Sequence, residues 1–117
     1  MSYLLLIVEP RGQRAERGEA AGKRLYAEMG AFATGLQERG VLLAVESLAS
    51  DTTGTRVQVR DGKPRMFDGP FTETKEMVGG FFLLNCTTRD EALQIAQQCP
   101  AAAWATVEVR AVGPCFT

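Results

Sequence analysis

The sequence predicts an α+β fold in which one antiparallel β-sheet carries two helices on a single face. Three observations predict it. Apolar runs with the length of strands recur along the chain, two stretches show helical periodicity, and one stretch alternates around an Asp-Gly pair. The length of 117 residues predicts one domain that spans residues 1–117.

The first half of the chain is expected to form a strand, a helix and a second strand. Tyr3–Val8 is a continuous apolar run that is typical of a strand buried on both faces. A polar stretch follows up to Gly18, either a loop or the start of a helix. The helix itself has apolar residues at i, i+4, i+7 and i+11, namely Leu25, Met29, Phe32 and Leu36. Gly40 ends it, and Val41–Val45 forms the next strand.

A hairpin is expected next, because Val57 and Val59 alternate with polar residues before the Asp61-Gly62 pair. Such a pair favours a two-residue turn, and Arg65–Phe67 forms the returning strand.

The remaining elements are a strand, a helix and a final strand. Phe81–Cys86 is another apolar strand, and Thr88 with Glu91 three residues later forms a capping box. The helix that follows buries the apolar side of its surface: Ala92, Ile95, Ala96 and Cys99. Thr106–Val112 alternates and is expected to have one solvated face.

The order β-α-β, hairpin, β-α-β is that of a ferredoxin-like fold with both helices on one face of the sheet. The strands that begin at Tyr3, Val41 and Phe81 are nevertheless apolar on both sides. A second copy of the sheet is the simplest cover for the helix-free face. The sequence therefore predicts a face-to-face homodimer, a dimeric α/β barrel.

Composition excludes several classes of function. The net charge is −1, and acidic residues interrupt the two basic stretches, which argues against direct nucleic-acid binding. No apolar stretch approaches the length of a membrane span. The three cysteines lack CxxC spacing and the chain has no histidine, so we expect no metal site and no cofactor. A cytoplasmic protein with reduced thiols is the default expectation.

The stretch DGPFTETKE, residues 68–76, supports two interpretations. In the first it is a structural corner, where Asp68 accepts backbone N–H groups, Gly69 supplies unusual dihedrals and Phe71 fills a gap in the core. In the second it is a site, because charged residues close to a rigid sheet are typical of ligand binding or catalysis. Glu73 or Lys75 would then point into a pocket and meet Glu46 or the first helix.

Glu46 is a further candidate, since a carboxylate buried at the end of an apolar strand could act as a general acid or base. A solvated carboxylate at a strand end is the alternative. Our candidate catalytic residues are Glu46, Asp68, Glu73 and Lys75. Our candidate ligand contacts are Met29, Phe71 and Glu76.

DGPFTETKE followed by GGFFLL resembles the DGPF-type members of the YCII-related proteins. Further support comes from the helix at Met29–Gly40 and from the stretches VLLAVESL and VEVRAV, so the resemblance covers nearly the whole chain. It implies the dimeric α/β-barrel fold. Many YCII-related proteins carry a histidine paired with an aspartate, and that histidine aligns near Met29. This chain has none, so the dyad is absent.

Three functions remain open. The first is a binding or accessory module for a small molecule or protein; the resemblance also implies a link to transcription initiation, because relatives are fused to sigma-factor domains. The second is a carboxylate-dependent enzyme with a cleft beside the DGPF loop. The third, a cofactor-free oxygenase, rests on analogy of fold alone.

Overall fold

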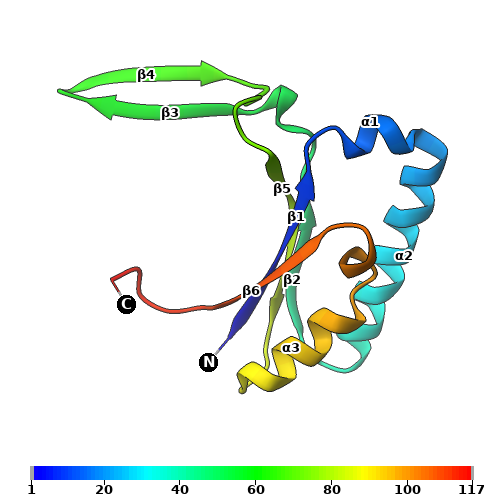
Figure 1. Ribbon diagram of the computed structural model, residues 1–117. Helices are drawn as coiled ribbons and strands as arrows, with labels where there is room; N and C mark the ends of the chain where they lie inside the picture. Colours follow the sequence, from blue (N-terminus) through cyan, green and yellow to red (C-terminus); the bar gives the residue numbers. More distant parts are fainter. Residues whose placement is uncertain (1, 117) are drawn as a thin grey trace.

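The computed structural model describes residues 2–116 and is built on a four-stranded antiparallel sheet with the order β2-β5-β1-β6 (Figure 1). Its strands are β1 (Tyr3–Pro10), β2 (Leu42–Ser47), β5 (Glu76–Leu84) and β6 (Thr106–Ala111). Each pair of neighbouring strands is antiparallel. The architecture is α+β, in agreement with the ferredoxin-like order expected from the sequence.

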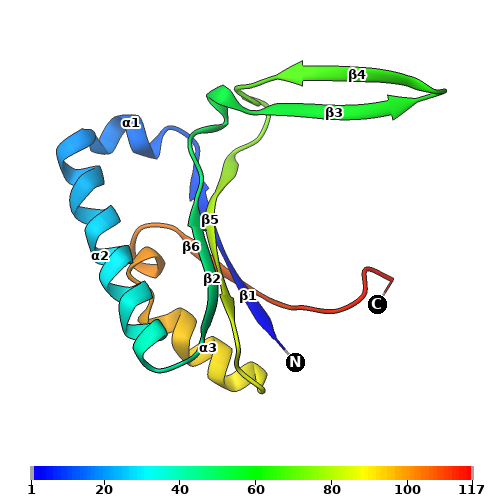
Figure 2. The same ribbon diagram turned by 180° about the vertical axis from the view of Figure 1, so that it is seen from behind.

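The helices lie on one face of this sheet, as Figures 1 and 2 show from opposite sides. The longer ones are α2 (Glu19–Glu38) and α3 (Arg89–Gln98). The polar stretch before α2 forms a short helix, α1 (Gln13–Arg17), which Gly18 separates from α2 at a φ of 82°. The structure also contains two 3₁₀ turns, η1 (Asp51–Thr53) between β2 and β3 and η2 (Pro100–Ala103) between α3 and β6. Thr88 accepts a hydrogen bond from the Glu91 N–H and caps α3 as expected.

The core lies between the sheet and the helices. Tyr3, Leu5 and Ile7 point into it, while the alternate residues of β1 are only half-buried on the helix-free face. The buried set also includes residues from β5, from the helices and from the segments next to them: Leu36, Phe82, Leu84, Cys86, Ala92, Ile95, Ala96, Cys99 and Ala101. Most of the apolar faces assigned from helical periodicity therefore meet in one cluster.

Two expectations about strands need correction. β5 begins at Glu76 and not at Phe81, so Gly79 and Gly80 lie inside the strand and are both buried. β2 is not buried as its apolar sequence suggested, since every residue from Leu43 to Ser47 is exposed. The reason is that β2 forms an edge of the sheet, and within residues 2–116 no segment covers the helix-free face beside it.

The hairpin consists of β3 (Thr55–Arg60) and β4 (Lys63–Asp68), which form a separate two-stranded sheet. Its turn is the expected one, because Asp61 and Gly62 have φ values of 54° and 74°. Within residues 2–116, no helix has both the length and the apolar character that a membrane span requires.

Candidate functional site

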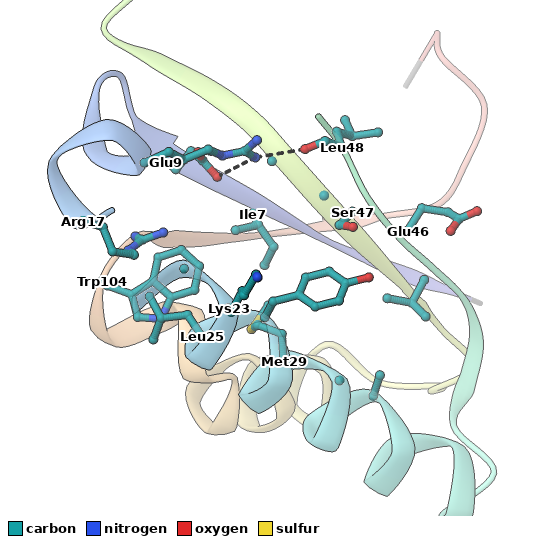
Figure 3. Close-up of a pocket in the computed structure, with 18 of the residues that line it drawn as sticks. Ile7, Glu9, Arg17, Lys23, Leu25, Met29, Glu46, Ser47, Leu48 and Trp104 are labelled. Carbon is teal, nitrogen blue, oxygen red and sulfur yellow. Dashed lines mark hydrogen bonds and ion pairs between the residues drawn. The ribbon is translucent and has the colours of Figure 1, made fainter. Parts of the chain in front are cut away.

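A cavity of ≈ 1000 Å³ lies between the sheet and α2 (Figure 3). Its walls are largely apolar and include side chains from β1, α2, β5 and the turn before β6, among them Ile7, Leu25, Met29, Phe82 and Trp104. A concave, mostly apolar space with a few polar groups has the usual composition of a small-molecule site.

An interruption in the apolar stripe of α2 contributes to the cavity. Gly22 precedes Leu25 and Met29 by three and seven residues, so it lies on the same face of the helix. Gly22 lines the cavity, and a Cβ placed on it would meet no other atom within 4 Å. A glycine at a position where the periodicity calls for a large apolar residue therefore leaves a hollow against the sheet.

Glu9 and Arg14 form an ion pair in the wall of this cavity (Figure 3). Nε of Arg14 donates to Oε1 of Glu9 at 2.6 Å, and Nη2 donates to Oε2 at 3.2 Å and to the Leu48 carbonyl at 3.0 Å. The Glu9 residue is only 4% exposed. A carboxylate buried this far requires a charged partner, and the two-point geometry of Arg14 supplies one.

Gly79 lets the carboxylate lie flat against the sheet. A Cβ at this position would stand 2.1 Å from Oε2 of Glu9 and 3.1 Å from Nη2 of Arg14. Any side chain on Gly79 would thus displace the ion pair. Gly80 is constrained by the backbone of the neighbouring strand, because a Cβ at this position would lie 2.8 Å from the Glu46 carbonyl oxygen.

Trp104 forms part of the cavity wall below the ion pair in Figure 3. The Arg17 guanidinium lies 4.7 Å from the centre of its ring, and Gln13 donates to its carbonyl oxygen. Its indole Nε1 is buried and has no hydrogen-bond partner within residues 2–116. Helix α1 therefore holds the only tryptophan of the chain in place.

Two of the candidate residues line the cavity. Met29 is half-buried in its wall, with its sulfur 3.9 Å from the Cys99 thiol. Glu46 contributes to the rim from β2, but its residue is exposed and its side chain points away from Met29 in Figure 3. Glu46 pairs with Phe81 across the strands, which places it on the helix-free side.

The other candidates lie outside it, since no residue between 68 and 76 lines this cavity. Asp68 accepts a hydrogen bond from the Thr55 hydroxyl, and Glu73 is 67% exposed and paired with Arg56 at 2.9 Å. The Arg56 guanidinium also covers the half-buried Phe71 ring, 3.8 Å from its centre. Lys75 and Glu76 are exposed.

Asp51, not Asp68, is the carboxylate that holds this corner. Its side chain accepts from the Phe71 N–H and is bound by the Arg11 guanidinium, which also donates to both oxygens of Thr74. The hydrogen bonds from Arg11 lower the pKa of the Asp51 carboxyl below its ordinary value. Arg11, Asp51 and Thr74 are far apart in the sequence, so local turn patterns could not predict their contacts.

The sequence interpretation assumed that Gly69 supplies unusual dihedrals. In the structure the position requires glycine because a side chain would not fit. Its φ lies outside the left-handed region, but a Cβ would stand 1.8 Å from the Asp51 carbonyl oxygen. The peptide between Gly69 and Pro70 is cis. The close approach of η1 to this corner thus explains the glycine.

The buried thiols are not nucleophiles. Burial raises the pKa of Cys86 and of Cys99, so both are protonated near neutral pH. The burial of Cys99 agrees with its expected place on the apolar side of the last helix.

Comparison with known proteins places these observations in a family. The family model for the YCII-related domain matches residues 1–115. An uncharacterized protein of Rhizobium meliloti (strain 1021) is 30% identical over 97 residues, which cover 83% of this chain and 78% of the relative.

Among solved structures, the chain is similar to 5-chloro-2-hydroxyhydroquinone dehydrochlorinase (TftG) from Burkholderia phenoliruptrix AC1100, in complex with 2,5-dihydroxybenzoquinone. The TM-score is 0.55 with 16% identity, over 97% of this chain and 94% of the other. At that identity the likeness concerns the fold alone. The match to the family model over residues 1–115 shows that this chain belongs to the YCII-related domain family.

Proposed function

We propose that this protein binds a small, ring-containing molecule in the cavity between the sheet and α2, with a polar group of the ligand directed at Arg14 and Glu9. The observation that carries the proposal is the Glu9–Arg14 pair, in which an almost fully buried carboxylate lies in the wall of a largely apolar cavity. A buried ion pair contributes little to stability compared with apolar packing, so a role in ligand recognition is the better reason to keep it.

The contacts suggest the chemistry of the ligand. Arg14 uses Nε and Nη2 for Glu9 and Leu48, and within residues 2–116 its Nη1 makes no hydrogen bond. Nη1 can therefore donate to a hydroxyl, carbonyl or carboxylate oxygen. Met29 and Trp104 supply polarizable and aromatic surface for a ring. Hydroxylated aromatic and quinone-like molecules combine these features.

The structural neighbour supports this choice of test compounds, since it was solved with 2,5-dihydroxybenzoquinone. We suggest titrating this compound and hydroquinone into the protein by isothermal calorimetry. The matched variants are Gly22→Leu, which places a large side chain in the cavity, and Gly35→Leu, which makes the same change in α2 at a position outside the cavity wall. We expect saturable binding to the wild type and to Gly35→Leu, and loss of binding in Gly22→Leu. Equal binding to all three proteins would contradict the proposed site.

A second candidate function is proton transfer on the bound ring: solvent adds a deuteron to a ring carbon of the enolate form, and Glu9 then accepts the proton that this carbon loses. Its support is the position of the Glu9 carboxylate, which lines the cavity while Arg14 holds it in one orientation. The test is exchange of ring hydrogen for deuterium in 2,5-dihydroxybenzoquinone in heavy water. Glu9→Gln should keep binding and lose any exchange above the buffer rate. Exchange that persists in this variant would exclude Glu9 as the base.

We also propose that the protomers pair through the helix-free face of the sheet. The support is that Leu4, Leu6, Val8, Phe81 and Leu83 remain only half-buried on that face. The chain exposes 7871 Å², whereas a monomeric protein of this mass is expected to expose about 6200 Å². Sedimentation at micromolar concentration tests the pairing. A wild-type monomer there would refute it, and Phe81→Lys should dissociate a dimer.

A further inference from the structure

The β3–β4 hairpin stands apart from the body of the protein. Figures 1 and 2 show it projecting past the sheet on the side opposite the helices. All residues of both strands are exposed. The radius of gyration is 16.0 Å, against about 13 Å for a compact domain of this length. The hairpin therefore extends over the space in front of the helix-free face.

The hairpin has one apolar side. The strand register pairs Val57 with Met66 and Val59 with Pro64, so these four side chains share a face. Val57, Val59 and Met66 are 59%, 60% and 70% exposed. The opposite face carries the polar pairs Gln58 with Arg65 and Arg60 with Lys63, and at the base of the hairpin it carries Arg56 with Phe67, which is 47% exposed.

A hairpin with an exposed apolar face needs further packing to be stable. A single two-stranded hairpin is at best marginally stable in water, and three or more strands or a packing partner are usually needed. The body supports only the base of the hairpin, where Arg56 contacts Glu73 and Phe71, and the strand residues remain exposed. A surface that covered Val57, Val59 and Met66 from outside the chain would therefore stabilise the hairpin.

The charges indicate which surface that is. Residues 55–68 carry four basic and two acidic side chains. The rim of the helix-free face carries Glu46 on one edge strand and Glu76 at the end of β5, neither of which makes an ion pair within residues 2–116. Glu108 on the other edge strand is paired with Arg110 at 3.3 Å. In a two-fold pair each copy presents its own acidic rim to the hairpin of the other. A second copy of this chain thus offers apolar surface and a complementary rim together.

We propose that the hairpin is an arm that grips a second copy of this chain, with the face formed by Val57, Val59 and Met66 against the partner. This goes beyond stacking of the two sheets, because it assigns a separate contact to the hairpin and makes it reciprocal. The arm lies on the opposite side of the sheet from the cavity, so its function does not depend on the ligand proposed above.

The test is the combined variant Val57→Thr, Val59→Thr and Met66→Gln, which removes apolar surface and keeps residues suited to a strand. Gln58→Thr on the opposite face is the matched control. Sedimentation equilibrium without ligand should show that the combined variant raises the dimer dissociation constant by at least about tenfold. The control should change it by less than about threefold.

Hydrogen exchange gives a second readout that does not depend on the variant. Amides of residues 55–68 should become more protected as the concentration of the wild-type protein rises through the dimer dissociation constant. A dissociation constant that is the same in the combined variant and the wild type would overturn the proposal. So would hairpin protection that is independent of concentration, or a wild type that stays monomeric.

Discussion

The corner at residues 68–76 and the cavity between the sheet and α2 use charged residues in opposite ways. In the corner, Glu73 is bound by Arg56 in the open, and Asp51 is bound by Arg11 at the back of the turn. In the cavity, one pair, Glu9 and Arg14, lies against apolar walls with Glu9 almost fully buried. Both regions contain several charged residues, since Arg17, Glu19, Lys23 and Glu46 also line the cavity, but Glu9 is the one that is almost fully buried.

The two regions therefore differ in how deeply their charged residues are buried more than in how many they contain. An exposed ion pair contributes about 0–1 kcal/mol and leaves no group in need of a partner. A buried carboxylate that loses its partner costs several times more, so its surroundings are tightly constrained. The four predictions below test this contrast, from the largest expected effect to the smallest.

Arg14→Met should have the largest effect, because it leaves Glu9 buried without a partner. Removing one partner of a buried pair costs 3–5 kcal/mol, and since Arg14 is itself about one-third exposed we expect a loss of about 2–4 kcal/mol in the free energy of unfolding. Urea denaturation measures this loss. The control is Lys75→Met at an exposed position of the corner. Equal losses in the two variants would remove the distinction between the regions.

Gly79→Ala should destabilise by about 1–3 kcal/mol, because the added methyl group must displace the Glu9 carboxylate. Gly35→Ala is the control, since a Cβ there meets no atom within 4 Å and alanine favours a helix by about 1 kcal/mol. The two substitutions are therefore expected to shift the denaturation midpoint in opposite directions. A stabilised Gly79→Ala protein would show that the ion pair does not need the flat surface.

Asp51→Asn should change how stability depends on pH at the acid end. The pKa of Asp51 is lowered in the folded protein, so its contribution is present above the ordinary aspartate pKa, about 3.9. That contribution is lost as the pH falls through the lowered value. Thermal melts from neutral to acid pH should therefore show the wild-type and variant midpoints converging below about pH 4. Parallel curves throughout would mean that Asp51 is not anchored by Arg11.

Glu73→Gln should be nearly neutral, within about 0.5 kcal/mol, because its partner Arg56 holds it at the surface. It should also leave the affinity for 2,5-dihydroxybenzoquinone unchanged. Loss of binding without loss of stability would instead make the DGPF corner part of the site.

Local patterns predicted most of the fold. Helical periodicity located Leu36 and Ile95 in the core, and the Asp61-Gly62 pair predicted the turn of the hairpin. The contacts of the corner could not be predicted from local patterns, because Arg11 and Asp51 reach it from distant parts of the chain. Only tertiary structure brings such partners together.

Of the candidate site residues, Met29 and Glu46 lie on the cavity and the other five lie elsewhere. The sequence analysis did not propose Glu9, Arg14 or Trp104 as site residues. A single carboxylate after an apolar strand, such as Glu9, does not indicate which residues will bury it in the folded protein. One signal was available in the sequence. Gly22 occupies a position in the apolar stripe of α2 where a large side chain is expected, and a gap in a periodic pattern predicts a hollow.

The most direct test of the proposed site is an NMR titration of ¹⁵N-labelled protein with 2,5-dihydroxybenzoquinone. The indole N–H of Trp104 gives a single resonance from the cavity wall, because the chain has one tryptophan. We predict saturable shifts of that resonance and of the Gly22 and Gly79 amides, no change in residues 71–76, and no response of the indole in Gly22→Leu. Shifts concentrated in residues 71–76, with the Trp104 indole unmoved, would contradict the account.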